Sequence, residues 1–140
     1  MRLALLAAVA ALAAGSSARA ADKVEGDWLT MDGGAKVRIA PCAGHADRLC
    51  GTIVWVKKAE EAQSKDIHNP DPKLRVRPIL GLPLISDFKF TSAGKWGGGK
   101  IYDPRSGRTY ASNMALTPDG ALKVNGCIAM LCQAQTWRRP

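Results

Sequence analysis

Short apolar stretches, separated by turns rich in glycine and proline, run through residues 26–139 of the chain. Residues 36–39 (Lys-Val-Arg-Ile) alternate polar and apolar side chains, and this period of two is typical of a strand with one buried face. The Gly-Gly pair at 33–34 just before them predicts a hairpin turn. Residues 51–57 are apolar on both faces, which predicts a strand that is covered on both sides.

Turn signals divide the rest of the chain into further strands. Pro104 and Gly107 suit a type I turn with a bulge, and the Pro-Asp-Gly run at 118–120 turns the chain again. The expected strands are residues 26–31, 36–39, 51–57, 84–90, 95–102, 108–116, 121–127 and 132–139. A meander of eight strands leaves two exposed edges unless it closes. We therefore predict an all-β fold, an eight-stranded antiparallel meander barrel.

One long connection interrupts this pattern. Residues 58–83 join the third and fourth expected strands, and their first part, residues 58–65, is polar and compatible with a helix. Four prolines follow, and they disfavour a regular ladder or a long helix. The prolines are Pro70, Pro72, Pro78 and Pro83. Aliphatic residues near its end favour packing against the body, so we expect an ordered crossover loop that could serve as a lid over one barrel mouth.

The N-terminus has the pattern of an export signal. Arg2 precedes an apolar run over residues 3–14, and Ala18 and Ala20 form the small-x-small motif that signal peptidase recognises. The run is too short to cross a bilayer of about 30 Å as a helix. We predict a signal peptide at residues 1–20 and a single β-barrel domain at residues 21–140, without a transmembrane segment in the mature form. The expected location is the periplasm or the cell exterior.

Composition and charge narrow the possible functions. Hydrophobic residues make up 46% and charged residues 23% of the 140 residues, as in ordinary globular domains. The formal net charge is +8, but the basic residues are dispersed along the chain. Dispersed charge is a weak signal for nucleic acid, which we do not expect as a partner. A basic exported protein is instead attracted to anionic components of the cell envelope.

The four cysteines predict two disulfides, because an oxidising compartment keeps cysteine pairs joined. Seven residues separate Cys42 from Cys50, and four separate Cys127 from Cys132. Either pair could lie at the neck of a hairpin, so local pairing is favoured, with a crossed pairing as the alternative. A zinc site formed by all four is disfavoured, since its ligand pairs usually have shorter spacing.

Several segments together resemble a known family. They are Gly26-Asp27-Trp28, the run Leu-Cys-Gly-Thr-Ile-Val-Trp at 49–55, Asn-Pro-Asp at 69–71, Arg-Pro-Ile-Leu-Gly at 77–81, residues 96–104, Gly107, Tyr110, Gly126-Cys127 and Gln-Thr-Trp-Arg-Arg at 135–139. In this order they resemble the bacterial secreted family catalogued as domain of unknown function 2147. The resemblance covers essentially the whole mature chain and implies a small periplasmic, lipocalin-like β-barrel. It implies no particular activity.

A second resemblance concerns how such a barrel is closed. Proteins similar to lipocalins begin their first strand with Gly-x-Trp, here Gly26 and Trp28, and place an arginine of the last strand over the indole. Arg138 and Arg139 are the two candidates in this chain. A guanidinium on an aromatic face contributes about 0.5 to 2 kcal/mol. The resemblance therefore implies structural roles for these residues.

The crossover also contains the best cluster of polar residues. Asp66 could orient the imidazole of His68 as a general base, but no serine or cysteine nucleophile is marked by its context. The alternative is that Asp66, Asn69 and Asp71 cap turns around the prolines. A metal site lacks the repeated spacing of ligands. We expect no metal and no cofactor, and the sequence favours a non-enzymatic role.

Arg75 and Arg77 are the candidate anion-binding residues. In an extended segment, side chains two positions apart point the same way, which suits a bidentate grip on a carboxylate or phosphate. Solvated surface side chains are the simpler alternative. The hypothesis places a shallow site for an anionic ligand at the open mouth of the barrel, lined by Asn69, Arg75, Arg77, Trp96 and Tyr102.

Three function classes follow from these observations. The first is a non-catalytic binding module for a small amphiphilic or anionic ligand or an envelope component. The second is a structural or stress-related envelope protein without a stored ligand. The third is a hydrolase that uses the Asp66/His68 cluster. The sequence leaves the ligand, the oligomeric state and the pathway open.

Overall fold

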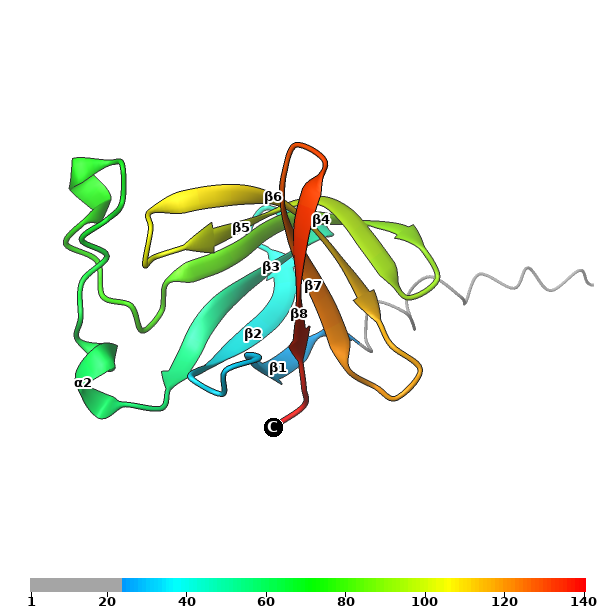
Figure 1. The fold of residues 1–140 in the computed structure, drawn as a ribbon, viewed down its shortest axis with the longest axis horizontal. Coiled ribbons are helices and arrows are strands. Elements are labelled where there is room, and N and C mark those ends of the chain that lie inside the picture. The colour runs from blue at the N-terminus through cyan, green and yellow to red at the C-terminus, as the bar shows by residue number, and fades with distance from the viewer. Residues whose placement is uncertain (1–23) are drawn as a thin grey trace, which may run out of the picture.

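A computed structural model describes residues 24–140, and the signal peptide predicted at residues 1–20 lies outside this range. Eight antiparallel strands follow one another in one sheet, each paired with the next along the chain (Figure 1). They are β1 (Gly26–Leu29), β2 (Ala35–Cys42), β3 (His45–Val56), β4 (Pro83–Ser92), β5 (Lys95–Asp103), β6 (Arg108–Leu116), β7 (Leu122–Ile128) and β8 (Leu131–Trp137). The predicted all-β meander is confirmed.

The sheet curls until its first and last strands meet at one bridge. The backbone N–H of Leu29 donates to the carbonyl of Arg138 at 2.7 Å, and the N–H of Arg138 donates back at 3.0 Å. Because neighbouring strands run in opposite directions, the connections β1–β2, β3–β4, β5–β6 and β7–β8 share one end of the barrel, here called the loop end. The other three turns lie at the opposite end, here called the terminal end, where the strands of the barrel begin and finish.

The β2–β3 hairpin differs from the prediction. No strand was expected between residues 39 and 51, but β2 continues to Cys42 and β3 begins at His45, which extends the hairpin beyond the expected strands. A shift in register lies between Pro41 and Cys42, so that Cys42 faces His45 while Cys50 faces Ala40. Hairpin extension and a bulge were not visible because this stretch lacks a clear apolar alternation.

The structure shows the local disulfide pairing. Cys42 is joined to Cys50 beside the register shift, and Cys127 is joined to Cys132, which faces it directly across β7 and β8. The expectation that both pairs face each other across a hairpin neck therefore holds for the second pair and is wrong for the first, because the bulge offsets Cys50 from Cys42.

Large aromatic side chains fill the barrel interior. Trp28, Trp96, Trp137 and Phe88 are all buried. A Cβ atom at Gly99 would lie 2.5 Å from the ring of Phe88, so this ring occupies space that only a glycine leaves open. The core therefore depends on a glycine where the ring of Phe88 on β4 approaches the backbone of the neighbouring strand β5 closely.

The long crossover carries two short helices. They are α2 (Ala59–Ala62) and the 3-10 helix η1 (Pro72–Leu74), and the segment lies at the loop end beside the β5–β6 turn (Figure 1). No helix within residues 24–140 is long and apolar enough to cross a membrane. The crossover is ordered, as expected, and its packing is described next.

Candidate functional site

The buried carboxylate of Asp66 is the centre of the crossover. Asp66 is 0% exposed, and its two oxygens accept three side-chain hydrogen bonds. The Tyr102 hydroxyl donates to Oδ1 at 2.6 Å, while Asn69 Nδ2 and Arg77 Nε donate to Oδ2 at 2.9 and 3.0 Å. Tyr102 belongs to β5, so these bonds fasten the crossover to the barrel wall. We call the four residues the Asp66 latch.

The protonation states of the latch follow from these contacts. Burial alone would raise the pKa of Asp66, but the hydrogen bonds from Tyr102, Asn69 and Arg77 outweigh it and hold the pKa below its ordinary 3.8. Burial, together with the neighbouring Asp66 carboxylate, raises the pKa of Tyr102 to about 12. The latch therefore pairs a carboxylate with a neutral phenol over the whole neutral pH range.

Local turns shape the segment around the latch. The Asp66 N–H donates to the Arg77 carbonyl at 3.0 Å, so the chain leaves and returns as a short antiparallel pair. Asn69 Oδ1 accepts from the Asp71 N–H at 2.9 Å, and Asp71 Oδ1 accepts from the Lys73 N–H at 3.0 Å at the start of η1. The turn-capping interpretation therefore describes Asn69 and Asp71, whereas Asp66 binds side chains instead.

The crossover also packs tightly on the β5–β6 turn. Gly107 in this turn has φ +73°, and a Cβ atom there would lie 1.8 Å from the carbonyl oxygen of His68. Any other residue would push the crossover away. The glycine expected for turn geometry thus also permits a close contact between two connections of the loop end.

Arg75 and Arg77 are both held through Nε. Arg75 Nε donates to the Asn69 carbonyl at 2.7 Å, and Arg77 Nε donates to Asp66 while its guanidinium lies 5.7 Å from the Tyr102 ring centre. Within residues 24–140, neither side chain uses its η nitrogens in a hydrogen bond. The two guanidinium groups are therefore oriented by the protein, and their outer nitrogens are available to another partner.

The backbone that brings the two arginines together is not the expected extended one. Arg75 has φ −66° and ψ −16°, a helical conformation at the end of η1. The two side chains nevertheless reach back to the same segment, residues 66–69, because the chain turns between them. The alternation argument that placed them on one face is thus wrong, although both meet the latch.

Trp96 does not join the cluster. It is buried in the core, faces Phe90 across β4 and β5, and contacts that ring edge-on at 6.4 Å between centres. Trp96 follows the β4–β5 turn and so belongs to the terminal end of the barrel. The structure brings Asn69, Arg75, Arg77 and Tyr102 together and places Trp96 elsewhere, because strand direction decides which end of the barrel a residue occupies.

His68 makes no hydrogen bond with Asp66 in the structure. Its side chain is exposed, while the Asp66 carboxylate is turned toward Tyr102, Asn69 and Arg77. The hydrolase alternative lacks the contact that would orient the imidazole. Among residues 24–140, no three side chains of His, Cys, Asp or Glu gather as a metal site requires.

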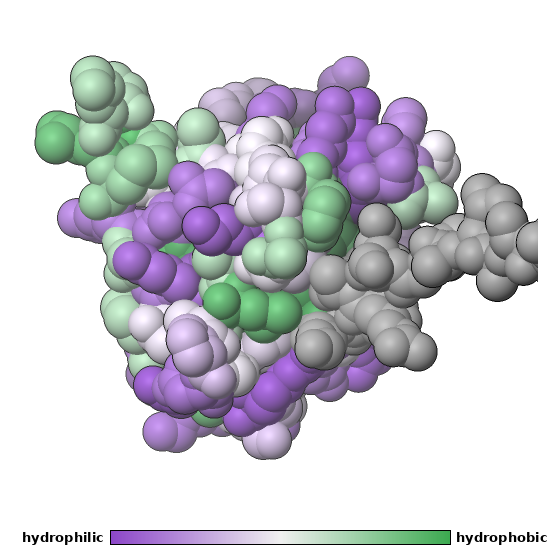
Figure 2. All heavy atoms as spheres, turned by 90° about the vertical axis from the view of Figure 1, so that its right-hand side faces the viewer, coloured by the Kyte–Doolittle hydropathy of each residue, from purple (hydrophilic) through white to green (hydrophobic). Residues whose placement is uncertain are grey.

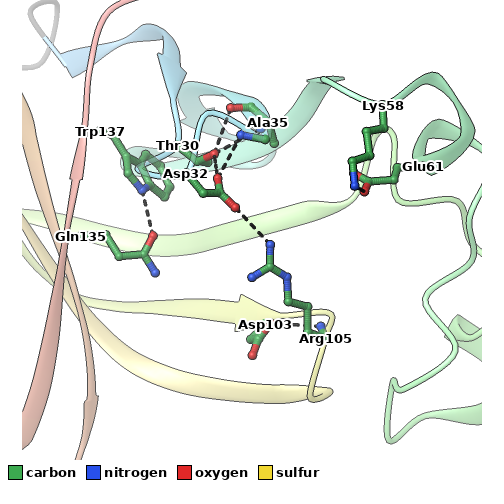
Figure 3. A network of polar contacts seen from close by, with 10 residues as sticks. Thr30, Asp32, Ala35, Lys58, Glu61, Asp103, Arg105, Gln135 and Trp137 are labelled. Atoms are coloured by element: carbon green, nitrogen blue, oxygen red, sulfur yellow. Dashed lines mark hydrogen bonds and ion pairs between the residues drawn. The ribbon is translucent and has the colours of Figure 1, made fainter.

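A second polar contact links the β5–β6 turn to the β1–β2 turn (Figure 3). Arg105 of the β5–β6 turn reaches Asp32 of the β1–β2 turn, with 3.1 Å between Nη2 and Oδ2. Asp32 is itself positioned by the Gly34 N–H and the Thr30 hydroxyl, at 3.0 and 2.7 Å. This pair was not predicted, since nothing in the local sequence indicates a contact between residues 73 positions apart.

The terminal end has the expected aromatic closure. The Arg139 guanidinium lies 3.9 Å from the ring centre of Trp28, whose indole N–H donates to the Val24 carbonyl at 2.7 Å. Arg138 instead forms an exposed ion pair with Asp119 at 3.4 Å. Of the two candidates, Arg139 is therefore the stacking residue. Gly26 lies next to this side chain, and a Cβ atom at Gly26 would lie only 3.0 Å from Nη1 of Arg139.

Comparisons with known proteins agree with this geometry. No functionally curated protein matches the sequence. A solved structure with a similar fold is protein HP1028 from the human pathogen Helicobacter pylori, described as belonging to the lipocalin family. The two chains are 24% identical, and the TM-score is 0.73 over 84% of this chain and 82% of that chain. This similarity establishes a lipocalin-like fold.

The sequence as a whole also matches a family profile. The match extends over residues 26–139, from the Gly-x-Trp of β1 to the arginine that stacks on it. The chain therefore belongs to the bacterial family described as "Uncharacterized protein conserved in bacteria (DUF2147)".

Proposed function

We propose that the protein is a non-catalytic binding module that takes a small anionic amphiphile at the loop end of its barrel. The lipocalin-like fold supports a binding role by analogy only. The observation that carries the proposal is the pair of guanidinium groups of Arg75 and Arg77, fixed through Nε with their η nitrogens available.

Charge favours an anion at this position. Asp66 is buried and balances one of the two guanidinium groups, so one positive charge is left over at the surface of the latch. Carboxylates and phosphates accept hydrogen bonds from guanidinium nitrogens with good geometry. Because the protein already holds both side chains, they would lose less conformational entropy when a ligand binds.

Neighbouring apolar side chains favour an amphiphile over a simple ion. Ile67 and Val76 flank the paired segment next to Asp66 and Arg77, and both are exposed. They are adjacent along the chain to the residues of the latch, and so they are presented to solvent in a fixed arrangement. An acyl or other apolar group attached to the anion could cover them.

The source of such a ligand follows from export. We propose that the chain is cleaved before Ala21 and acts in the periplasm or outside the cell, where lipid-derived amphiphiles and anionic envelope components occur. The formal net charge of +8 falls to +6 when Arg2 and Arg19 leave with the signal peptide, and this basic balance supports attraction to such molecules.

Calorimetric titration with decanoate and with lysophosphatidic acid tests the proposal, with decanol as an uncharged comparison. We expect the anions to bind and Arg75→Gln to weaken them about ten-fold or more, the loss typical of a hydrogen bond to a charged group. Arg38→Gln is the matched control, because Arg38 lies on the outer wall of β2 in an exposed pair with Asp27. Unchanged affinity in Arg75→Gln would contradict the assigned site.

One observation favours a second candidate function. Four large aromatic side chains fill the interior of the barrel, as in a protein whose core serves stability alone. A structural or stress-related envelope protein would bind none of these amphiphiles, and the titration therefore separates the two functions.

A further inference from the structure

The tip of the β7–β8 hairpin is an apolar projection. Within residues 128–131, Ile128, Met130 and Leu131 are 58, 96 and 83% exposed. The turn stands at the top of the molecule in Figure 1, and Figure 2 shows the same tip as an apolar knob at the upper left. Side chains of this kind are rarely grouped on a protruding turn that contacts only water.

The tip departs from ordinary turn chemistry. Ala129 has φ +52°, in the left-handed region where two-residue hairpin turns normally place Gly, Asn or Asp. An alanine in this conformation costs free energy that a glycine would avoid. A less favourable but apolar residue at the most exposed point of the hairpin indicates a role other than turning the chain.

The hairpin that carries the tip is stapled and uncharged. The Cys127–Cys132 disulfide joins facing residues directly beneath the tip, which limits how far the turn can fold back onto the barrel. No charged residue occurs between Lys123 and Arg138 in the sequence. The outer half of this hairpin can therefore enter an apolar medium without burying a charge.

Shape and size identify the medium. Three side chains on a convex tip are far fewer than a specific protein interface needs, since such interfaces bury roughly 1,200 to 2,000 Å². A lipid layer needs no complementary shape and accepts a small apolar projection. The crossover runs along the left of Figure 1, with α2 low and the 3-10 helix η1 near the upper edge, and η1 carries the exposed Lys73, which suits anionic headgroups.

We propose that residues 128–131 insert into the surface of an anionic lipid bilayer, with Lys73 of η1 contacting the headgroups. The insertion anchors the barrel at a membrane surface and does not depend on the binding of a small amphiphile at Arg75 and Arg77. The two proposals can therefore fail separately.

Vesicle co-sedimentation tests this inference with the exported, processed protein, whose N-terminus is first established by intact mass. The vesicles are phosphatidylcholine with or without phosphatidylglycerol. We expect binding to the mixed vesicles. The affinity should fall about ten-fold or more in Met130→Asp, because this variant lacks the apolar side chain that leaves water on insertion. Met31→Asp is the matched control, an exposed methionine on the β1–β2 turn at the lower edge of Figure 1.

The following outcomes would each overturn the inference. Absence of binding by the unaltered protein excludes it, and equal losses in Met130→Asp and Met31→Asp would show general adhesion rather than insertion of the tip. A dimer that becomes a monomer in Met130→Asp, measured by light scattering without vesicles, would make the tip a self-association site. In a second measurement, Met130→Trp should give fluorescence that brominated acyl chains quench, and no quenching would contradict insertion.

Discussion

At the scale of single residues, the chemistry of the loop end depends on one buried carboxylate. Asp66 receives hydrogen bonds from a phenol, an amide and a guanidinium, and each of these groups comes from a different position in the chain. Removing one donor leaves the buried charge less well satisfied, which is more harmful than the loss of an exposed hydrogen bond. The stability of the crossover should therefore respond to single substitutions within the latch.

The Tyr102→Phe substitution tests the latch through pH. We expect the free energy of unfolding at pH 7 to fall by about 1.5 to 3 kcal/mol, because Asp66 loses a donor. The pKa of Tyr102 is raised to about 12, so its contribution is complete below the ordinary value of 10.0 and is lost as pH rises toward 12. Urea unfolding across this range should show the difference between the two proteins shrinking. A difference that stays constant with pH would contradict the role assigned to the phenol.

A pair of glycine substitutions tests the contact between the crossover and the β5–β6 turn. Gly107 and Gly120 have similar backbone angles, φ +73° and +82°, but a Cβ atom meets the His68 carbonyl only at Gly107. Both alanine variants should lose about 1 to 2 kcal/mol for the left-handed conformation. Gly107→Ala should lose more and should expose the crossover to trypsin at Lys65 and Lys73. Equal losses in the two variants would show that the close contact is unimportant.

At the scale of elements, the strands alternate between regular pairing and specific irregularities. Ile85 and Phe88 both face the core although they are three positions apart, because Asp87 between them adopts φ +62° and shifts the alternation of β4. The β3–β4 register is irregular over the same stretch. Such bulges bend a strand and direct an additional side chain inward, which helps a curled sheet to close around large aromatic residues.

Closure of the first strand onto the last can be tested with adjacent arginines. Arg139→Ala removes the guanidinium over Trp28 and its bond to the Asp27 carbonyl, and we expect a loss of about 1 to 2 kcal/mol in the free energy of unfolding. Arg138→Ala removes only an exposed ion pair, which contributes about 0 to 1 kcal/mol. Denaturant unfolding followed by tryptophan fluorescence measures both. A larger loss in the Arg138 variant would reverse this assignment.

At the scale of the whole molecule, the meander decides which residues share an end of the barrel. Three of the four connections at the loop end contact one another, because Arg105 of the β5–β6 turn reaches Asp32 and the crossover packs on the same turn. The terminal end holds the Trp28–Arg139 stack. Anion-binding and membrane-docking residues are both proposed at the loop end, opposite the aromatic closure, where connections can vary without disturbing the core.

Export also concerns the whole molecule, and mass spectrometry tests it. We expect the protein recovered from the periplasm or medium to begin at Ala21, because Ala18 and Ala20 form the cleavage motif. The intact mass should also be lower by the mass of four hydrogens, one pair for each disulfide shown by the structure. An exported protein that retains residues 1–20 would contradict the predicted signal peptide.

Local sequence patterns were enough to predict the class of the fold and the order of its strands. Apolar alternation and turn residues were sufficient for eight strands in meander order, and β6 (Arg108–Leu116) has the predicted limits. The Gly-x-Trp and the terminal arginines indicated how the barrel closes. These features depend on local periodicity and on short motifs, which are readable from neighbouring residues.

The polar residues that contact one another could be identified only in the folded chain. Trp96 was grouped with Arg77 in the sequence but lies toward the other end of the barrel, and Asp66 was paired with His68 but binds Tyr102, 36 positions away. The choice of Arg139 over Arg138 likewise depends on how β8 meets β1. The physical reason is that hydrogen bonds and ring contacts depend on distance in space, which strand register, bulges and the path of the crossover set together, whereas local sequence carries only the periodicity of each strand.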